Sequence, residues 1–183
     1  MPPSGASSRE PSPVADPPFQ PRKLLETLIR HDVDLVLIGG AAGAARGSAY
    51  ITFDLDIAYE RSRANLERLA DALRELEATL RGAAQGIPFL LDAKTLENGA
   101  DFTFETRYGS LDILADPSGA PSYTTLREGA GEPLEVEGFR VRVASLDHLI
   151  AMKEAAGRPK DLVAASEYRV ISDELRRPRD DAS

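Results

Sequence analysis

Apolar residues recur along the chain at two different spacings, and this change divides it into helices and strands. The leucines from 66 to 80 are separated by steps of three and four, which is the period of an amphipathic helix. Ser62 caps the start of this pattern and Gly82 follows its last leucine, so a helix is predicted over 62–82. Further helices are predicted from Pro21, over 41–45, over 145–156 and from Pro159 onward.

Strand-like segments lie between these helices. The run Leu35–Ile38 is short, apolar and followed by two glycines, as is typical of a buried strand. The other predicted strands are 51–59, 87–91, 101–106, 111–114 and 134–143. This alternation predicts a mixed α/β (α+β) fold, with a central sheet flanked by helices and a short helical part at the C-terminus.

The two ends of the chain differ in composition from the middle. Seven of the thirteen prolines fall in the first 21 positions, among Ser, Ala and Gly. Such a segment buries too little apolar surface to offset its ordering entropy, so residues 1–20 are predicted to form a disordered arm. Residues 21–175 are predicted to form one domain, with a core over 21–144 and C-terminal helices over 145–175, followed by a frayed tail over 176–183.

Composition excludes several classes of chemistry. The 183 residues include no Cys and two His, which excludes a thiol nucleophile, a disulfide framework and a metal site built from histidines. The formal net charge of -8 argues against general nucleic-acid binding, because that affinity depends on neutralising phosphates. No apolar run of about 18 residues and no leader-like segment is evident, so we expect a cytoplasmic protein without a membrane partner.

Two carboxylates on a predicted strand are candidates for a metal site. Asp54 and Asp56 are two positions apart, so a strand presents both on one face, whereas Leu55 and Ile57 point into the core. Hard oxygen ligands of this kind suit Mg²⁺ or Mn²⁺. The alternative is a half-exposed strand with two solvated acids. Asp112 is likewise an acid among apolar strand residues, and it needs either solvent or a partner.

Gly39 and Gly40 follow a strand and precede a predicted helix. Glycine allows close approach of the backbone to a phosphate, and a helix start offers free N–H groups. The alternative is a plain turn. The pair is not a P-loop, because no Gly-Lys-Ser/Thr follows, and the glycine spacing does not match a dinucleotide-binding fingerprint.

The order of these elements resembles a known superfamily. A strand, the Gly-Gly pair, a short helix, Asp-x-Asp on a strand and a third Asp on a later strand are similar to the DNA polymerase beta-like nucleotidyltransferases. The closest likeness is to their minimal members, the AbiEii-type and MenT-like toxins of bacterial toxin–antitoxin systems. The likeness covers residues 22–172 and is carried by segments 37–40, 47–48, 52–57, 111–114, 143–146, 152–153 and 157–162.

The resemblance implies transfer of a nucleotide from an NTP by a two-metal site that uses Mg²⁺ or Mn²⁺. Asp54 and Asp56 would hold both ions, and Asp112 would complete the ion on the nucleophile side and help as a general base. These three acids are thus the expected catalytic residues and metal ligands.

The resemblance also assigns nucleotide-binding residues around the carboxylates. Gly39 and Gly40 would cradle the triphosphate, with the hydroxyl of Ser48 nearby. Strand alternation places Thr52 on the face of Asp54, so its hydroxyl is also expected at the site. The alternative for Thr52 is ordinary filling of a strand by a β-branched residue.

Cations for the triphosphate are expected from the C-terminal helices. The resemblance implies that Lys153 reaches the nucleotide and that Asp161 closes a Lys–Asp pair. The alternatives are a solvated helix lysine and an acid favoured by a helix dipole. Relatives often carry a basic residue where this chain has Ala49 and Tyr50. Either Arg46 stands in for it, or the phosphate contacts come from elsewhere in the chain.

The resemblance implies that the protein is a toxin that modifies the 3′ end of tRNA, with a cognate antitoxin as partner. The acidic net charge opposes this unless a basic lip compensates, and its candidate members are Arg46, Arg61, Arg63, Arg107, Arg127, Arg158 and Lys160. Alternatives are modification of a small molecule, as in aminoglycoside-modifying enzymes, modification of a protein, or a degenerate transferase that serves as a binding module. Small-molecule enzymes usually add a helical domain, for which few residues remain after Ser145.

Overall fold

A five-stranded mixed sheet forms the centre of the computed structural model, which describes residues 18–82 and 89–177. The sheet order is β1-β2-β5-β4-β3, and β2 and β5 are its parallel pair. This arrangement, flanked by helices, confirms the predicted fold class. The strands are β1 (Leu35–Ile38), β2 (Asp54–Tyr59), β3 (Thr79–Leu80), β4 (Asp101–Thr106) and β5 (Gly109–Leu114), with a separate hairpin of β6 (Leu134–Val136) and β7 (Phe139–Val141).

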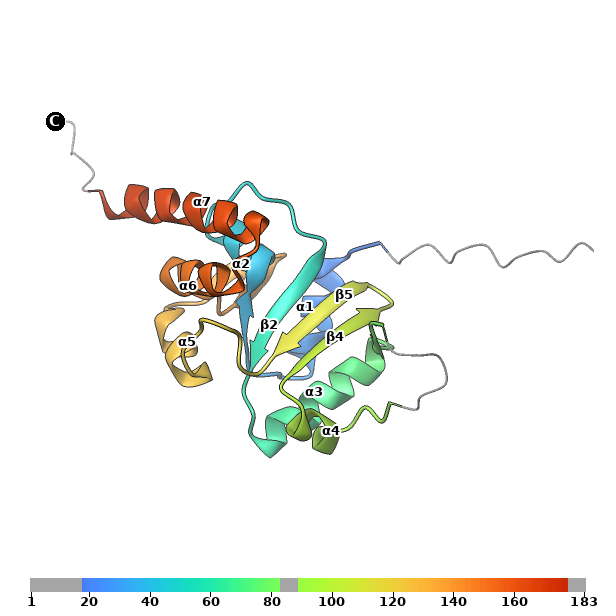
Figure 1. The fold of residues 1–183 in the computed structure, drawn as a ribbon. Coiled ribbons are helices and arrows are strands. Elements are labelled where there is room, and N and C mark those ends of the chain that lie inside the picture. The colour runs from blue at the N-terminus through green and yellow to red at the C-terminus, as the bar shows by residue number, and fades with distance from the viewer. Residues whose placement is uncertain (1–17, 83–88, 178–183) are drawn as a thin grey trace, which may run out of the picture.

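The helices divide into two groups around the sheet (Figure 1). α1 and α3 lie behind the sheet, whereas α2, α5, α6 and α7 gather beside β1 and β2. The face of β2, β4 and β5 turned toward the viewer carries no helix in this view. The helices are α1 (Pro21–Arg30), α2 (Gly39–Ala45), α3 (Arg63–Glu75), α4 (Ala93–Asn98), α5 (Tyr123–Gly129), α6 (Leu146–Ala156) and α7 (Pro159–Arg176).

Side chains on β2 and β5 alternate between the core and the open face. Leu55, Ile57 and Leu111 are fully buried, whereas Asp54 and Asp112 keep partial exposure. Burying an aliphatic side chain contributes about 1.5–3 kcal/mol, so these leucines and isoleucines fix which face of each strand turns inward. The acids are consequently held on the opposite face.

Four predicted elements were placed wrongly or too broadly. The helix predicted over 62–82 ends at Glu75, because Glu77 adopts a left-handed backbone (φ 55°) and Thr79–Leu80 pairs with β4. The strand predicted over 134–143 is a hairpin that turns at Glu137 and Gly138, both with positive φ. The strand predicted over 51–59 begins only at Asp54. Of the strand predicted over 87–91, residues 87–88 lie outside the described residues and 89–91 form no strand.

The C-terminal helices are tied to the sheet. The Leu37 N–H donates to the Arg142 carbonyl (2.8 Å), and the Ala144 N–H donates to the Leu37 carbonyl (2.9 Å), so this segment extends along β1. The Ser145 hydroxyl caps α6, and Gly157 ends it with φ 65°, as the sequence predicted. The start of α6 is thereby fixed relative to the carboxylate-bearing strand.

The predicted disordered arm and tail are only partly within the described residues. Residues 1–17 and 178–183 lie outside them. Contrary to the prediction for 1–20, Phe19 packs against the core and the Gln20 N–H donates to the Tyr108 carbonyl (2.9 Å). Contrary to the predicted start of the tail at 176, α7 includes Arg176. Across the described ranges, no helix combines the length and apolarity needed to cross a membrane.

Candidate functional site

Three carboxylates converge on the open face of the sheet. Parallel pairing of β2 with β5 sets Asp56 directly beside Asp112, and Asp54 lies two positions earlier on the same face. One oxygen from each of the three lies within 4.8 Å of the others. Residues 56 positions apart in the sequence (112 minus 56) are thus brought together by strand register. The structure thus brings the three predicted site acids together on one face of the sheet.

The glycine pair lies against this cluster because Ile38 pairs with Asp56 across β1 and β2. Gly39 has φ 65°, and a Cβ there would lie 2.0 Å from Asp56 Oδ2. A Cβ on Gly40 would lie 2.7 Å from Thr52 Oγ1, and the Gly40 N–H donates to Asp56. A side chain at Gly39 would therefore collide with Asp56 and one at Gly40 with Thr52, which explains why both are glycine.

The two predicted hydroxyls have different surroundings. Thr52 Oγ1 donates to Asp54 Oδ1 at 2.5 Å, as the strand alternation suggested, although Thr52 precedes β2. Ser48 Oγ instead donates to Glu167 Oε2 at 2.9 Å, because its side chain faces α7. The expectation of a Ser48 hydroxyl beside the triphosphate is therefore not supported by its position, and Ser48 instead anchors the loop before β2.

Burial and mutual repulsion make this cluster electrostatically costly. Burial and the negative charges of Asp54 and Asp112 together raise the pKa of Asp56 from 3.8 to about 7, against the opposing charge of Lys153. Burial also raises the pKa of Asp112, although the Arg81 guanidinium opposes the shift. Nearby positive charge would lower both pKa values, so the cluster is electrostatically suited to cations.

The donor set fits a hard divalent ion. Asp112 Oδ1 is buried and accepts no hydrogen bond from any described residue, although Arg81 Nη2 lies 3.4 Å away. A buried carboxylate oxygen without a donor is costly, and coordination to a cation would satisfy it. Three carboxylate oxygens at this spacing match the ligand preference of Mg²⁺ and Mn²⁺.

The predicted Lys–Asp pair is present at the start of α7. Lys153 Nζ donates to Asp161 Oδ1 at 2.9 Å, and Arg158 donates to Asp161 Oδ2. The Asp161 carboxylate is fully buried by these contacts. Burial alone would raise its pKa, yet the two hydrogen-bonded cations lower it. Asp161 was predicted to bind nucleotide, but both its oxygens serve to position Lys153 and Arg158.

Arg81 was missed from the sequence and lies at the opposite side of the carboxylates. Its guanidinium bonds Glu105 Oε1 (2.7 Å) and approaches Asp112 Oδ1 (3.4 Å). The prediction of an unbroken helix over 62–82 placed Arg81 on a solvated helix end. The β-branched Thr79 in that stretch was a weak signal for the short strand that positions it.

Two adjoining hollows share the centre of the site. One, of about 440 Å³, includes Asp54, Asp112 and Arg81. The other, of about 250 Å³, runs past Gly39 toward apolar residues of β5 and α6. Both are lined by Asp56, Lys153, Arg158 and Asp161. The carboxylates therefore lie where the two hollows meet, so a molecule bound in either hollow would be next to them.

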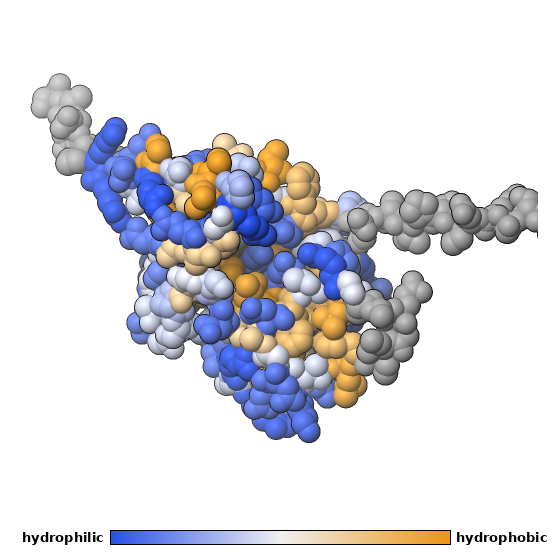
Figure 2. Space-filling view, in the orientation of Figure 1, coloured by the Kyte–Doolittle hydropathy of each residue, from blue (hydrophilic) through white to orange (hydrophobic). Residues whose placement is uncertain are grey.

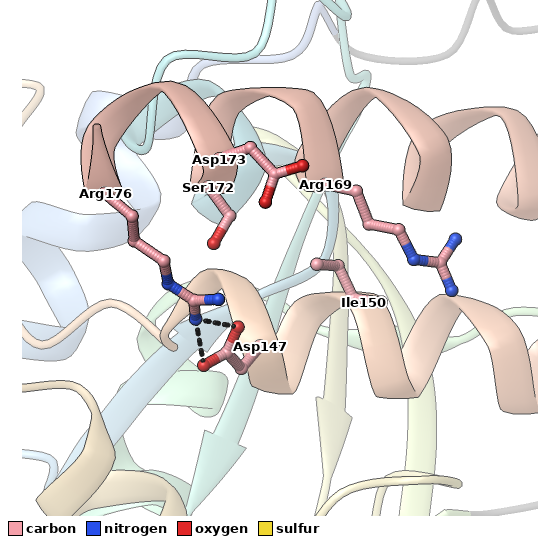
Figure 3. Close-up of a pocket in the computed structure, with 6 residues that line it drawn as sticks. All are labelled: Asp147, Ile150, Arg169, Ser172, Asp173 and Arg176. Carbon is pink, nitrogen blue, oxygen red and sulfur yellow. Dashed lines mark hydrogen bonds and ion pairs between the residues drawn. The ribbon is translucent and has the colours of Figure 1, made fainter.

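A third hollow lies between α6 and α7 and differs in character. Its lining residues come from both helices (Figure 3) and are Asp147, Ile150, Arg169, Ser172, Asp173 and Arg176. Arg176 donates to both carboxylate oxygens of Asp147, at 2.8 and 2.9 Å, and Arg169 pairs with Glu154. Opposite charges are thus joined across this groove.

Arg46 does not stand in for the missing basic residue of the relatives. Its guanidinium donates to the carbonyls of Ala130 (2.9 Å), Val143 (2.7 Å) and Ala144 (3.1 Å), and burial lowers its pKa. The reason is that α2 directs this side chain toward the start of α6, away from the carboxylates. Arg46 is therefore a structural link between α2 and the C-terminal helices.

Most other members of the predicted basic lip are also engaged elsewhere. Arg61 donates to two backbone carbonyls at the end of α4. Acids pair with Arg63, Arg107, Arg127 and Arg158, and the cleft itself is lined by Arg158 and Lys160 from the predicted set. A continuous basic surface is consequently not formed by these seven side chains.

Comparison with known proteins gives matches in structure rather than in sequence. No family model matches the chain, and no curated protein matches its sequence. The lincomycin-bound lincosamide antibiotic adenylyltransferase LnuA is similar in structure, with TM-score 0.57 and 12% identity, over 85% of this chain and 99% of LnuA.

The antibiotic-resistance factor ANT(2″)-Ia is similar as well. Its solution structure matches with TM-score 0.54 and 17% identity, over 84% of this chain and 80% of that one. Its crystal structure with adenylyl-2″-tobramycin matches with TM-score 0.51 and 18% identity, over 84% and 93% of the two chains. At such low identity these likenesses show the fold, and they confirm the nucleotidyltransferase fold predicted from the sequence.

Proposed function

We propose that this chain, which has the fold of an antibiotic adenylyltransferase, is a divalent-metal-dependent nucleotidyltransferase. The observation that carries the proposal is the convergence of Asp54, Asp56 and Asp112 within 4.8 Å, against the glycine start of α2. Three carboxylates that repel one another on a partly buried face lower the stability of the folded chain, so their presence indicates a chemical role. For the same reason a degenerate binding module is the weaker interpretation.

The residues of the site have different proposed roles in the transfer. Asp54 and Asp56 would hold two divalent ions and Asp112 the one on the acceptor side. When bound, these ions activate the acceptor hydroxyl and neutralise the triphosphate. Lys153, positioned by Asp161, would add positive charge at the phosphates.

The reaction itself is a simple exchange of bonds at the α-phosphorus of the NTP. The acceptor oxygen bonds to this phosphorus, the bond from phosphorus to the pyrophosphate oxygen breaks, and pyrophosphate leaves with that electron pair. The acceptor proton passes to the carboxylate of Asp112, the acid on that side of the cluster. Gly39 and Gly40 would let the triphosphate approach the backbone closely.

A small hydroxyl compound is the acceptor class that we favour. The sequence argument against it was that a separate helical domain is lacking after Ser145. That argument does not exclude a small-molecule acceptor, because the structural match extends over 99% of LnuA, whose structure holds lincomycin. A chain of this length and fold therefore suffices for a small-molecule adenylyltransferase.

The 3′ end of tRNA remains the second candidate, and with it a toxin role and a cognate antitoxin. The order of sequence motifs favours it. The net charge of -8 and the internal pairing of most predicted lip arginines oppose it. Modification of a protein hydroxyl remains a further alternative of the same chemistry.

The proposal is tested by incubating the protein with each α-labelled NTP and Mg²⁺, in turn with lincomycin, tobramycin and total tRNA. We expect label transfer to one acceptor, loss of transfer with EDTA, and loss in the Asp56→Asn variant. The matched control is Asp147→Asn, an exposed acid of the α6–α7 groove. Equal transfer by wild type and Asp56→Asn, or nucleotide binding that is indifferent to Mg²⁺, would falsify the proposal.

A further inference from the structure

The two sides of the carboxylate cluster differ in what surrounds them. On the β1 side lie the start of α2 and Lys153, both suited to phosphates. On the other side lie Arg81 and Asp112, toward β4 and β3. If the proposed transfer is correct, the triphosphate belongs to the first side and the acceptor to the second.

The larger hollow, which also holds Arg81 and Asp112, is bordered by exposed apolar side chains. The segment leading into β2 exposes 51% of Tyr50, 75% of Ile51 and 75% of Phe53, and all three line the larger hollow. Figure 2 shows apolar surface at the top of the view, where this segment passes in Figure 1. Three large apolar residues within four positions at the mouth of a cleft favour a ligand with an apolar face.

The apolar segment and Arg81 line the same hollow from different strands of the sheet. Asp54, Ser110, Glu105 and Thr79 are successive cross-strand partners, so they form one row across β2, β5, β4 and β3. β2 and β3 run in the same direction, so Phe53, just before this row, and Arg81, just after it, lie on opposite sides of the row. The Arg81 side chain reaches back to bond Glu105. The apolar mouth and the guanidinium therefore border the same hollow from two ends.

Every acid that lines the larger hollow is either a proposed metal ligand or already paired with cations. Its lining acids are Asp54, Asp56, Asp112 and Asp161. The first three are the proposed metal ligands, and Asp161 is fully occupied by Lys153 and Arg158. Nearby Glu105 is bonded by Arg81 and Ser110. Within the described part of the chain, this cleft offers an acceptor's ammonium groups no uncommitted lining carboxylate.

We infer that the acceptor is an amphiphilic hydroxyl compound with an apolar face and at most one positive charge, bound between Arg81 and the apolar mouth of Tyr50, Ile51 and Phe53. This inference rests on the proposed nucleotidyl transfer and narrows it. A polycationic aminoglycoside would meet the Arg81 guanidinium and would lack counter-charges. An apolar face would instead cover side chains that are otherwise in contact with water.

The test measures acceptor binding without turnover. The full chain is loaded with Mg²⁺ and an α,β-methylene NTP analogue, and calorimetry then compares lincomycin, chloramphenicol, tobramycin and total tRNA. We expect binding of at least one of the two amphiphilic probes and none of tobramycin. Preferential binding of tobramycin or tRNA, or no binding of either amphiphilic probe, overturns the inference.

Variants locate the binding to the apolar mouth. Phe53→Ser and Ile51→Ser are each expected to weaken binding of the amphiphilic probe about tenfold or more, as the loss of a buried apolar contact implies. The nucleotide analogue should bind within about twofold of wild type, because a twofold change is under 0.5 kcal/mol. Leu175→Ser is the matched control, since Leu175 is 72% exposed on α7 and does not line either hollow.

The two proposals fail in different ways. Loss of Mg²⁺-dependent binding of the nucleotide analogue would overturn the nucleotidyltransferase itself. Normal nucleotide binding, together with probe binding that is unchanged in Phe53→Ser and Ile51→Ser, would overturn only the acceptor site.

Discussion

The cleft above β2 and the groove between α6 and α7 are both lined with charged side chains, yet the arrangement of charge differs. In the groove, Arg176 pairs with Asp147 (Figure 3), and Arg169 pairs with Glu154, so both arginines have an acidic partner. In the cleft, Asp54, Asp56 and Asp112 face one another. The ion pairs of the groove stabilise the folded chain without a ligand, whereas the clustered acids of the cleft destabilise it.

This difference teaches where a ligand is needed. Exposed ion pairs such as Arg176–Asp147 stabilise a protein by at most about 1 kcal/mol and point to no ligand. A buried cluster of like charges destabilises the folded chain until a cation binds. The contrast therefore favours the cleft, rather than the more regular groove, as the site of the proposed chemistry.

The largest expected effect comes from removing one charge of the cleft. Asp56→Asn keeps the shape of the side chain but removes a metal ligand, so nucleotidyl transfer should fall by roughly 10²–10³-fold or more. The metal-free variant should melt at a higher temperature than the metal-free wild type, because repulsion is relieved. Label transfer and thermal unfolding in EDTA measure the two effects. A drop in both activity and melting temperature would show that Asp56 is structural instead.

A second effect concerns the helix that borders both hollows. A Cβ on Gly43 would lie 2.1 Å from the Tyr168 hydroxyl oxygen, and both residues are buried. Gly43→Ala should therefore lower the free energy of unfolding by roughly 1–3 kcal/mol through overpacking. Helix propensity alone predicts the opposite sign, a gain of about 0.5–1 kcal/mol. Urea unfolding of Gly43→Ala distinguishes the two, and Gly43→Ala combined with Tyr168→Ala should recover part of the steric loss.

A third effect is a dependence of stability on pH that arises from Asp56 in the cleft. The pKa of Asp56 rises from 3.8 to about 7 in the fold, so the folded state holds its proton more tightly than the unfolded state between these values. Its contribution to stability is greatest below pH 3.8 and is lost as the pH rises through 7. The metal-free wild type should thus lose stability relative to Asp56→Asn from pH 4 to 7. Melting curves in EDTA check this, and a pH-independent difference would contradict it.

The smallest effect is expected in the groove. Asp147→Asn breaks an ion pair whose two side chains are each 65% exposed, so the free energy of unfolding should change by less than about 1 kcal/mol. Nucleotidyl transfer should stay at the wild-type rate. A double-mutant cycle with Arg176→Gln measures the pair directly, and 0.5 M salt should reduce it further. A strong loss of transfer in Asp147→Asn would mean that the groove contributes to the site.

Local patterns in the sequence determined the elements and the facing of the acids. Period-two alternation places Asp54 and Asp56 on one face of β2 because successive strand side chains point to opposite sides. Caps such as Ser145 and Gly157 act within one helical turn, so they too were predicted correctly. The chain reversals at Glu77 and Glu137 were not predicted. Both residues have a left-handed backbone, and the spacing of apolar residues does not change at such a position.

Only the tertiary structure decided which side chains meet. Sequence patterns do not encode the register that pairs Asp56 with Asp112, or the short β3 that brings Arg81 to the same carboxylate. The resemblance implied a Lys–Asp pair at Asp161, but not its second partner, Arg158, which precedes α7. The physical reason is that hydrophobic burial and chain geometry act locally, whereas charges meet only where packed elements bring them within a few ångströms.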